Sequence, residues 1–348
     1  MKKKFEIKIF SEFNEELEKK WTTLEKEANI TIFQTYNWQK YWYLNCGHDI
    51  KIVNVLIFDY EKLIAILPFH IKKKIFKILS WNGFPFSDYN LPIIRNNTYI
   101  KNEDYKNIFL DLKKNYNFDV LHLINNADSD FYNKKNFISN KTYKLNLNEE
   151  KTYKEIVDKL KKKIKYENNK IKKNYKLEIN LKPSNNEKKE IINFFVKQKA
   201  NQLERTRGWN YLNLERYKNY IVNIQNLNNE VTNYSFIKLN GKIVASHIGY
   251  NFRNIFFYIF PVYDVNFKKF SLGNILLLNI LEFCETNKII CFDLTIGDEK
   301  YKEKLSNKVE NLYEVIESFN SFGFVYKLYI ISKSIIKNFV YLLKKNFR

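Results

Sequence analysis

Five polar side chains in the C-terminal half of the sequence have the types that proton transfer and charge stabilisation require. His247 lies in a mostly apolar run, and the ordinary pKa of histidine suits a general base near neutral pH. The alternative is a histidine packed in the core of a buried strand. Asp293 and Glu299 are the other candidate bases, although Asp293 could instead bond loop amides. Tyr301 and Lys302 follow, where they could stabilise developing charge.

A second group of residues could hold an anion. Ser271, Gly273 and Asn274 open an apolar run to about residue 286, which predicts a helix with Ser271 as its N-cap. The N-terminus of a helix presents free backbone N–H groups to a phosphate. Lys269 adds positive charge just before the helix. We therefore expect Ser271, Gly273, Asn274 and Lys269 to form a pyrophosphate site.

The elements around these residues are predicted from turn and strand signals. Asn240 and Gly241 separate two β-rich runs, which is the strongest short signal for a hairpin. The runs 243–250 and 256–260 have the composition of strands, and a further buried strand is expected at 289–294, after the helix. The order of hairpin, strand, helix and strand predicts an α/β arrangement, with polar residues following its last strand.

At these positions the chain resembles the CelD-like acyltransferases, a branch of the GNAT superfamily related to the FemAB peptidyltransferases. The resemblance covers most of residues 20–320 and is carried by four motifs in order. The motifs are Asn240-Gly241 with Ala245; Tyr263-Asp264; Ser271 and Gly273 with Leu276; and Phe292-Asp293 with Gly297, Glu299, Tyr301 and Lys302.

The resemblance implies an α/β (α+β) fold, with a GNAT-like mixed sheet flanked by helices and two GNAT-like lobes in tandem. A degenerate N-terminal lobe is expected at 1–150 and an acyltransferase lobe at 151–321, followed by a basic amphipathic helix at 322–348. The implied cosubstrate is acetyl-CoA or another acyl-CoA. Its pantetheine would lie where the strands 243–250 and 256–260 splay apart. No metal is expected, since four histidines are too few and scattered.

Two further pairs of residues are candidates for substrate binding. Asp88 and Tyr89 stand in a turn-rich loop that matches an element of the family, although an aspartate there is often a turn former. Arg205 and Arg207 lie together at the end of a predicted helix. Planar guanidinium groups suit carboxylate or phosphate, but the helix dipole alone also favours cations at that end.

The net charge of +21 comes almost entirely from lysine, in a chain also rich in Asn, Ile, Phe and Tyr. Codons rich in A and T would give this composition, and no DNA-binding motif is present, so DNA is excluded as a partner. The lysine-rich stretch 153–175 is either a solvated helix face or a phosphate-binding surface, for example for tRNA. Three separated cysteines indicate a cytoplasmic protein.

The tail after residue 321 alternates apolar residues with lysines and predicts a basic amphipathic helix. Its apolar members are Tyr326, Ile330, Ile331, Ile335, Phe339 and Leu342, and its lysines are Lys327, Lys333, Lys337, Lys344 and Lys345. Such a helix could pack on the protein or lie on an anionic membrane surface. In the second case the protein would be peripheral, at the inner face of the membrane.

Together these features predict an acyltransferase that modifies a hydroxyl or amine of a sugar in cell-surface polysaccharide biosynthesis. A polysaccharide precursor would then be the acceptor. One alternative is a Fem-like aminoacyltransferase that uses charged tRNA. The other is a non-catalytic scaffold of a polysaccharide assembly complex.

Overall fold

The computed structural model describes residues 5–128, 131–132, 137–206, 208–223, 231–297 and 299–346. The chain divides into two compact units: unit 1 is Met1–Asn140 with Asn311–Arg348, and unit 2 is Lys141–Glu310. The final strand and helix thus belong with the N-terminal residues. The sequence instead suggested boundaries after residues 150 and 321, and these stay predictions.

Unit 1 contains a mixed sheet in which β4 and β6 are parallel and the other described pairs are antiparallel. Its order is β1-β2-β3-β4-β6-β13, and β5 pairs with β3. Long apolar runs explain why β2 and β3 are buried over most of their length. The strands are β1 Glu6–Phe10, β2 Ile50–Asp59, β3 Lys62–Lys73, β4 Lys77–Trp81, β5 Ile93–Ile94, β6 Val120–Asn126 and β13 Lys308–Ser318.

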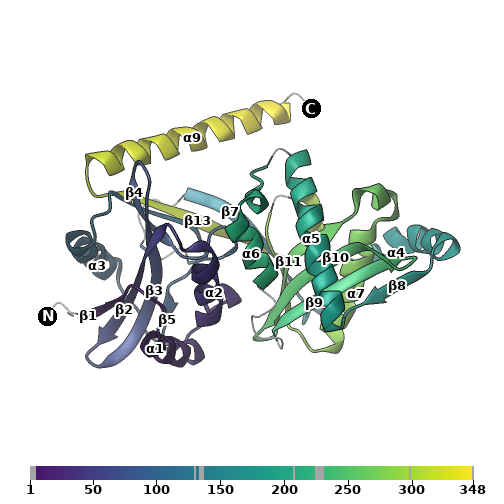
Figure 1. Ribbon diagram of the computed structural model, residues 1–348, viewed down its shortest axis with the longest axis horizontal. Helices are drawn as coiled ribbons and strands as arrows, with labels where there is room; N and C mark the ends of the chain where they lie inside the picture. Colours follow the sequence, from purple (N-terminus) through teal and green to yellow (C-terminus); the bar gives the residue numbers. More distant parts are fainter. Residues whose placement is uncertain are drawn as a thin grey trace. The chain divides into compact units, whose positions relative to one another are not determined.

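Helices cover both faces of this sheet (Figure 1). α3 packs on the face that carries Phe69. The next residue, His70, points to the opposite face and contacts Trp42 of α2, with ring centroids 5.4 Å apart. The helices are α1 Glu15–Lys26, α2 Tyr36–Cys46, α3 Asn102–Asn115 and α9 Ser321–Asn346.

Unit 2 contains the sheet β7-β12-β11-β10-β9-β8. All its described pairs are antiparallel except β11 and β12, which are parallel and connected by α7. The predicted hairpin at Asn240 and Gly241 is confirmed, and both residues have positive φ, as a tight hairpin turn requires. The strands are β7 Phe137–Asn146, β8 Leu177–Asn180, β9 Thr232–Leu239, β10 Lys242–Phe252, β11 Ile255–Tyr263 and β12 Cys291–Ile296.

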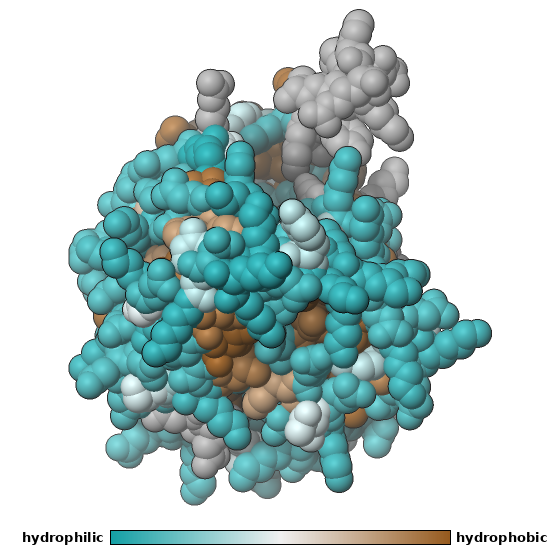
Figure 2. Space-filling view, turned by 90° about the vertical axis from the view of Figure 1, so that its right-hand side faces the viewer, coloured by the Kyte–Doolittle hydropathy of each residue, from teal (hydrophilic) through white to brown (hydrophobic). Residues whose placement is uncertain are grey.

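Two layers of helices flank the sheet of unit 2. α4 and α7 share one hydrophobic core with one face, while α5 crosses the other face, where Phe195 meets Phe260 (Figure 1). Hydrophilic side chains cover most of the end of the molecule shown in Figure 2, with a hydrophobic group near its centre. The helices are α4 Glu150–Asn174, α5 Asn185–Arg205, α6 Glu215–Asn223, α7 Leu272–Thr286 and α8 Lys300–Leu305.

The predicted mixed sheet flanked by helices is therefore confirmed. Within α4, Ile156, Leu160, Ile164 and Ile171 form the buried stripe that their spacing indicated. None of the helices, over the residues that the structure describes, is long and apolar enough to cross a membrane.

Candidate active site

β11 and β12 run together for only a short distance. Their ladder joins Ile255 with Cys291, Phe256 with Phe292 and Phe257 with Asp293, and in the described strands it ends there. β11 nevertheless continues to Tyr263. Its backbone edge beyond Phe257 thus faces the side of β12 without being paired to it. An extended ligand could add to such an edge through main-chain hydrogen bonds.

The runs 243–250 and 256–260 were predicted to be the strands that splay apart, and this prediction is wrong. Those runs belong to β10 and β11, which stay paired from Ala245 with Tyr263 to Phe252 with Ile255. The register shifts between Ile248 and Tyr250, so β11 carries one extra residue in a bulge. Tyr258 lies in that bulge, at the point where β11 leaves β12.

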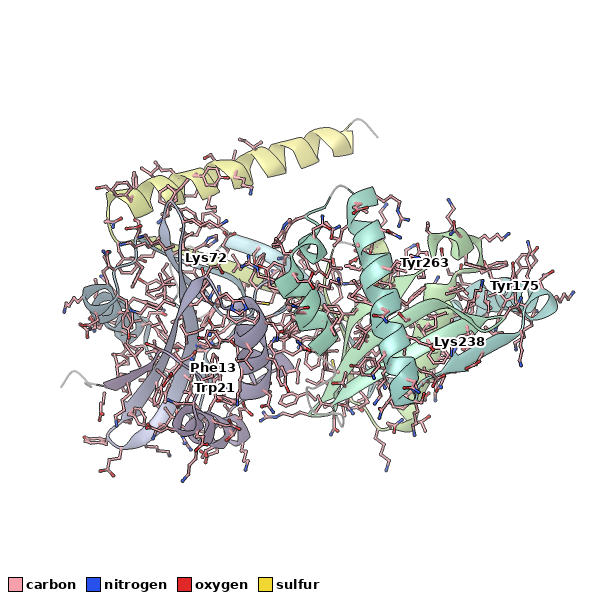
Figure 3. The ribbon with its side chains drawn as sticks, in the orientation of Figure 1. Phe13, Trp21, Lys72, Tyr175, Lys238 and Tyr263 are labelled. Atoms are coloured by element: carbon pink, nitrogen blue, oxygen red, sulfur yellow. The ribbon has the colours of Figure 1, made fainter. Side chains whose placement is uncertain are left out.

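The start of α7 faces open space on the side of Gly273. A Cβ atom added at Gly273 would have the ring of Tyr263 as its nearest neighbour, at an ordinary 3.8 Å. Figure 3 labels Tyr263 at the end of β11. Packing within the described chain therefore does not require a glycine here, whereas a ligand lying close to the backbone would.

Ser271 immediately precedes α7 and has a left-handed backbone, with φ of 52°. Its carbonyl accepts hydrogen bonds from the backbone N–H groups of Asn274 and Ile275, at 2.9 and 3.1 Å. Ser271 is the N-cap residue of α7, as predicted, but its side chain makes no capping bond to any described residue. The hydroxyl thus remains available to a ligand at the helix N-terminus.

The predicted cation Lys269 lies in the 3₁₀ turn Val265–Phe270, which leads into α7. Lys269 is exposed, and its ammonium group lies 5.1 Å from the centre of the Phe270 ring. Tyr175, which follows α4 and is labelled in Figure 3, packs on the same ring with 5.7 Å between centroids. The end of the lysine-rich α4 is therefore fixed beside the proposed phosphate turn.

His247 is completely buried in β10. Its ring stacks on Tyr258, with 4.2 Å between centroids and 11° between planes. Neither ring nitrogen has a hydrogen-bond partner among the described residues. Burial lowers the pKa of His247 to about 3, so the imidazole is neutral at physiological pH. Ser235, also buried, stands directly opposite on β9, and its hydroxyl likewise has no partner within the described chain.

Asp293 stabilises the backbone at the end of β12. It is buried, and its Oδ1 accepts a hydrogen bond of 2.8 Å from the backbone N–H of Thr295, a residue with a positive φ of 58°. Lys144 on β7 lies nearby. Burial opposes its charge, but Asp293 and Glu310 outweigh that effect and raise the pKa of Lys144. The hydrogen bond to the backbone N–H of Thr295 indicates a structural role for Asp293.

Glu299 and Lys302 form a clamp over Gly297. The buried Lys302 pairs with Glu299 at 3.3 Å and donates a hydrogen bond to the carbonyl of Ile296. Gly297 has φ of 144°, and a Cβ atom there would lie 2.1 Å from Glu299 Oε2. The spacing of glycine, glutamate and lysine after β12 thus has a structural explanation. Tyr301 packs against the core of unit 2, and burial raises its pKa.

The candidate substrate residues fall in different units. Asp88 is partly exposed in unit 1, and Tyr89 is buried there, with its ring against Phe33 and its carbonyl accepting from Gln34. Arg205 is exposed at the end of α5 in unit 2, while Arg207 lies outside the described residues. Asp88 and Tyr89 thus belong to unit 1 and Arg205 to unit 2, and the substrate roles of both pairs stay predictions.

Sequence reasoning did not identify Tyr258 or Ser235. Both lie in runs whose residue types are typical of ordinary buried strands, so composition gives no sign of them. The pairing partner of His247 could have indicated Ser235 once the hairpin register was known. The bulge at Tyr258 has no comparable signal. Within the described ranges, no group of three His, Cys, Asp or Glu side chains is arranged to hold a metal ion.

Residues 158–303 match the model of a family described as Acetyltransferase (GNAT) domain. This segment runs from α4 into α8 and includes the divergent strands and the start of α7. That part of the chain is therefore a GNAT acetyltransferase domain, and the protein is an acyltransferase. No curated protein has a sequence that matches the chain.

Solved structures share the fold over both units at very low identity. FemX is 9% identical, with a TM-score of 0.56, covering 90% of this chain and 97% of that one. A tandem GNAT protein from the clavulanic acid biosynthesis pathway is 7% identical, with a TM-score of 0.54 and coverage of 90% and 98%. L-PGS from Bacillus licheniformis is 10% identical, with a TM-score of 0.53 and coverage of 95% and 99%. The predicted GNAT-like fold with two lobes in tandem is thus confirmed, and FemX shares that fold.

Proposed function

We propose that unit 2 binds an acyl-CoA between β11 and β12 and transfers its acyl group to a hydroxyl or amine of a sugar in cell-surface polysaccharide synthesis. The observation that carries the first part is the divergence of β11 from β12 after Phe257, beside the open start of α7. The CelD-like resemblance of the sequence motifs supports the sugar acceptor.

The residues present suit the parts of an acyl-CoA. The edge of β11 from Tyr258 onward can pair with the amide groups of an extended pantetheine. The pyrophosphate fits at the N-terminus of α7, near Ser271, Gly273 and Asn274, with Lys269 nearby. Bound there, the thioester supplies an activated acyl group, and the chain's task is to hold it beside the acceptor.

Proton transfer from the acceptor requires a base. His247 remains our candidate, because its neutral imidazole lies directly under Tyr258 at the bulge. Its burial means that the acceptor's proton would reach it only through an opening of that stack, because no hydrogen bond joins a ring nitrogen to any described residue. The same opening would expose the imidazole to water and restore its basicity. Glu299 and Lys302 bind each other, so we assign them to shaping the loop after β12.

Calorimetry on the purified protein tests the cosubstrate, with acetyl-CoA and longer acyl-CoA molecules as titrants. We expect one of them to bind to the unaltered protein and not to Gly273→Trp, whose indole would fill the open space at α7. Acyl transfer to amino sugars and to sugar hydroxyls would then be assayed. Failure of every acyl-CoA to bind would refute the proposal.

A second candidate is aminoacyl transfer from charged tRNA. The lysines of α4 favour it: Lys159, Lys161, Lys162, Lys163 and Lys165 are exposed around the buried stripe. A gel shift with charged tRNA distinguishes the two candidates. Replacement of these lysines by glutamate would abolish the shift if α4 binds tRNA, and would leave acyl-CoA binding largely intact under the first proposal.

A further inference from the structure

One side of α9 is apolar and exposed. The large hydrophobic side chains on this side have exposed fractions between 50% and 67%. Their helical spacing places them on one broad face. They are Phe322, Phe324, Val325, Leu328, Tyr329, Ile335 and Ile336.

The opposite side of α9 is attached to unit 1. A Cβ atom at Gly323 would lie 2.0 Å from the carbonyl oxygen of Asp119, so the helix starts in direct contact with the segment before β6. One turn later, the Tyr326 hydroxyl lies 2.7 Å from Nδ1 of His122, and the Tyr326 ring packs on Phe76. This anchoring directs the apolar face away from unit 1.

The turn between β3 and β4 adds a further exposed apolar residue beside α9. Ile75 is 87% exposed at the tip of this turn, next to Lys73 and Lys74. Its neighbour Phe76 meets Tyr326 of α9 at 5.3 Å between ring centroids. Figure 1 shows the turn reaching the beginning of α9. Two segments far apart in the sequence therefore present apolar side chains from neighbouring positions.

Both segments carry positive charge and no negative charge. Residues 321–348 contain five lysines, one arginine and no Asp or Glu, and residues 70–77 contain four lysines and no acid. An apolar face accompanied only by cations is complementary to an anionic lipid surface. A second copy docked on the same face would instead bring these like charges together. None of the described helices could span the bilayer, which leaves binding in the plane of its surface.

We propose that the exposed face of α9 and the β3–β4 turn together bind anionic lipid bilayers. The apolar side chains enter the boundary between headgroups and acyl chains, and the lysines contact the lipid phosphates. This interaction would hold the enzyme at a membrane surface. The inference rests on unit 1 alone and does not depend on the acyl donor or acceptor of unit 2.

Vesicle sedimentation of the full-length protein tests this surface. We expect the protein to bind vesicles of phosphatidylcholine mixed with phosphatidylglycerol, to leave them as salt is raised, and to bind phosphatidylcholine alone weakly. Leu328→Glu with Ile335→Glu should reduce binding at least about tenfold, and Ile75→Glu should reduce it as well. Tyr60→Glu, which alters an exposed aromatic side chain in the β2–β3 turn, at the opposite end of β3 from Ile75, is the matched control and should have no effect.

A second variant changes only charged residues, so that a loss of binding cannot be attributed to misfolding of the helix. Lys333→Glu together with Lys73→Glu leaves the apolar face in place and should weaken binding by at least about fivefold for each lysine that contacts the lipid. Equal binding of these variants and the control would overturn the proposal, as would failure of the unaltered protein to bind the mixed vesicles. The proposal would also fall if the α9 variants changed only the oligomeric mass in solution.

Discussion

The imidazole of His247 lies almost parallel to the phenol ring of Tyr258, 4.2 Å away, at the bulge where β11 leaves β12. This stack connects the middle of β10 to the place where the sheet opens. Phe256 and Phe292 continue the same layer of rings. The buried histidine therefore supports the geometry of the splay.

The burial of His247 predicts a particular loss of stability in acid. The folded protein keeps its imidazole neutral down to a pKa of about 3, whereas the unfolded chain takes up a proton near 6.5. This contribution to stability is complete above about pH 6.5 and falls as the pH drops, by roughly 1.4 kcal/mol per unit.

His247→Phe should therefore flatten the acid side of the stability profile. Between about pH 6.5 and 5, the unaltered protein should lose about 2 kcal/mol more than the variant in its free energy of unfolding. Urea titrations at several pH values measure this difference. His48→Phe, which makes the same substitution at an exposed position, is the control variant. Parallel profiles for the unaltered protein and His247→Phe would contradict the account.

Gly273→Ala should weaken acyl-CoA binding without lowering stability. The added methyl group meets only Tyr263 at 3.8 Å within the described chain, but it would project into the space assigned to the ligand. We expect the dissociation constant to rise about tenfold, or about 1.4 kcal/mol. Gly208→Ala is a matched control, because its methyl group also makes ordinary contacts, at 3.6 Å or more. Similar affinities for the two variants would argue against a ligand at α7.

Gly297→Ala should destabilise the protein through both strain and steric overlap. Its φ of 144° is unfavourable for alanine, and its methyl group would collide with the Glu299–Lys302 pair. A loss of about 2–4 kcal/mol is expected from denaturant titration. Gly241→Ala separates the two causes, because its φ of 79° is also positive but no atom lies within 4 Å of the new methyl group. The steric role of the Glu299–Lys302 pair would be disproved if Gly297→Ala lowered the free energy of unfolding by no more than Gly241→Ala does.

Two substitutions at Asp293 distinguish a structural from a catalytic role. Asp293→Asn keeps an oxygen for the backbone N–H of Thr295, whereas Asp293→Ala leaves that buried N–H unsatisfied, at a cost of about 1–3 kcal/mol. The structural role predicts that the asparagine variant retains stability and most of its transfer activity. A stable but inactive Asp293→Asn enzyme would instead identify Asp293 as the base.

The sequence predicted those features that depend on local signals. The Asn240–Gly241 hairpin, the start of α7 beside Ser271 and the buried stripe of α4 are set by turn chemistry and helical periodicity, and all are confirmed. The pair of strands that separates was assigned wrongly. It depends on a bulge in β11 and on the parallel pairing with β12, and both are settled by tertiary contacts that no short segment encodes.

The roles of the residues in the motif after β12 also depend on tertiary contacts that the sequence does not show. Glu299, Tyr301 and Lys302 have the chemistry of a catalytic group, and the sequence shows only their types. The structure adds the ion pair across Gly297 and the burial of Lys302, which give the motif a structural purpose. A residue's environment, which decides between these roles, is visible only once the fold is known.

Hydrogen exchange of the backbone amides, measured with and without acyl-CoA, tests the central claim most directly. If the cosubstrate lies between β11 and β12, it should slow exchange at residues 258–263 and 272–274, and Gly273→Trp should abolish that protection. Protection confined to α4, or no change at either segment despite measurable binding, would contradict the assignment of this opening as the acyl-CoA site.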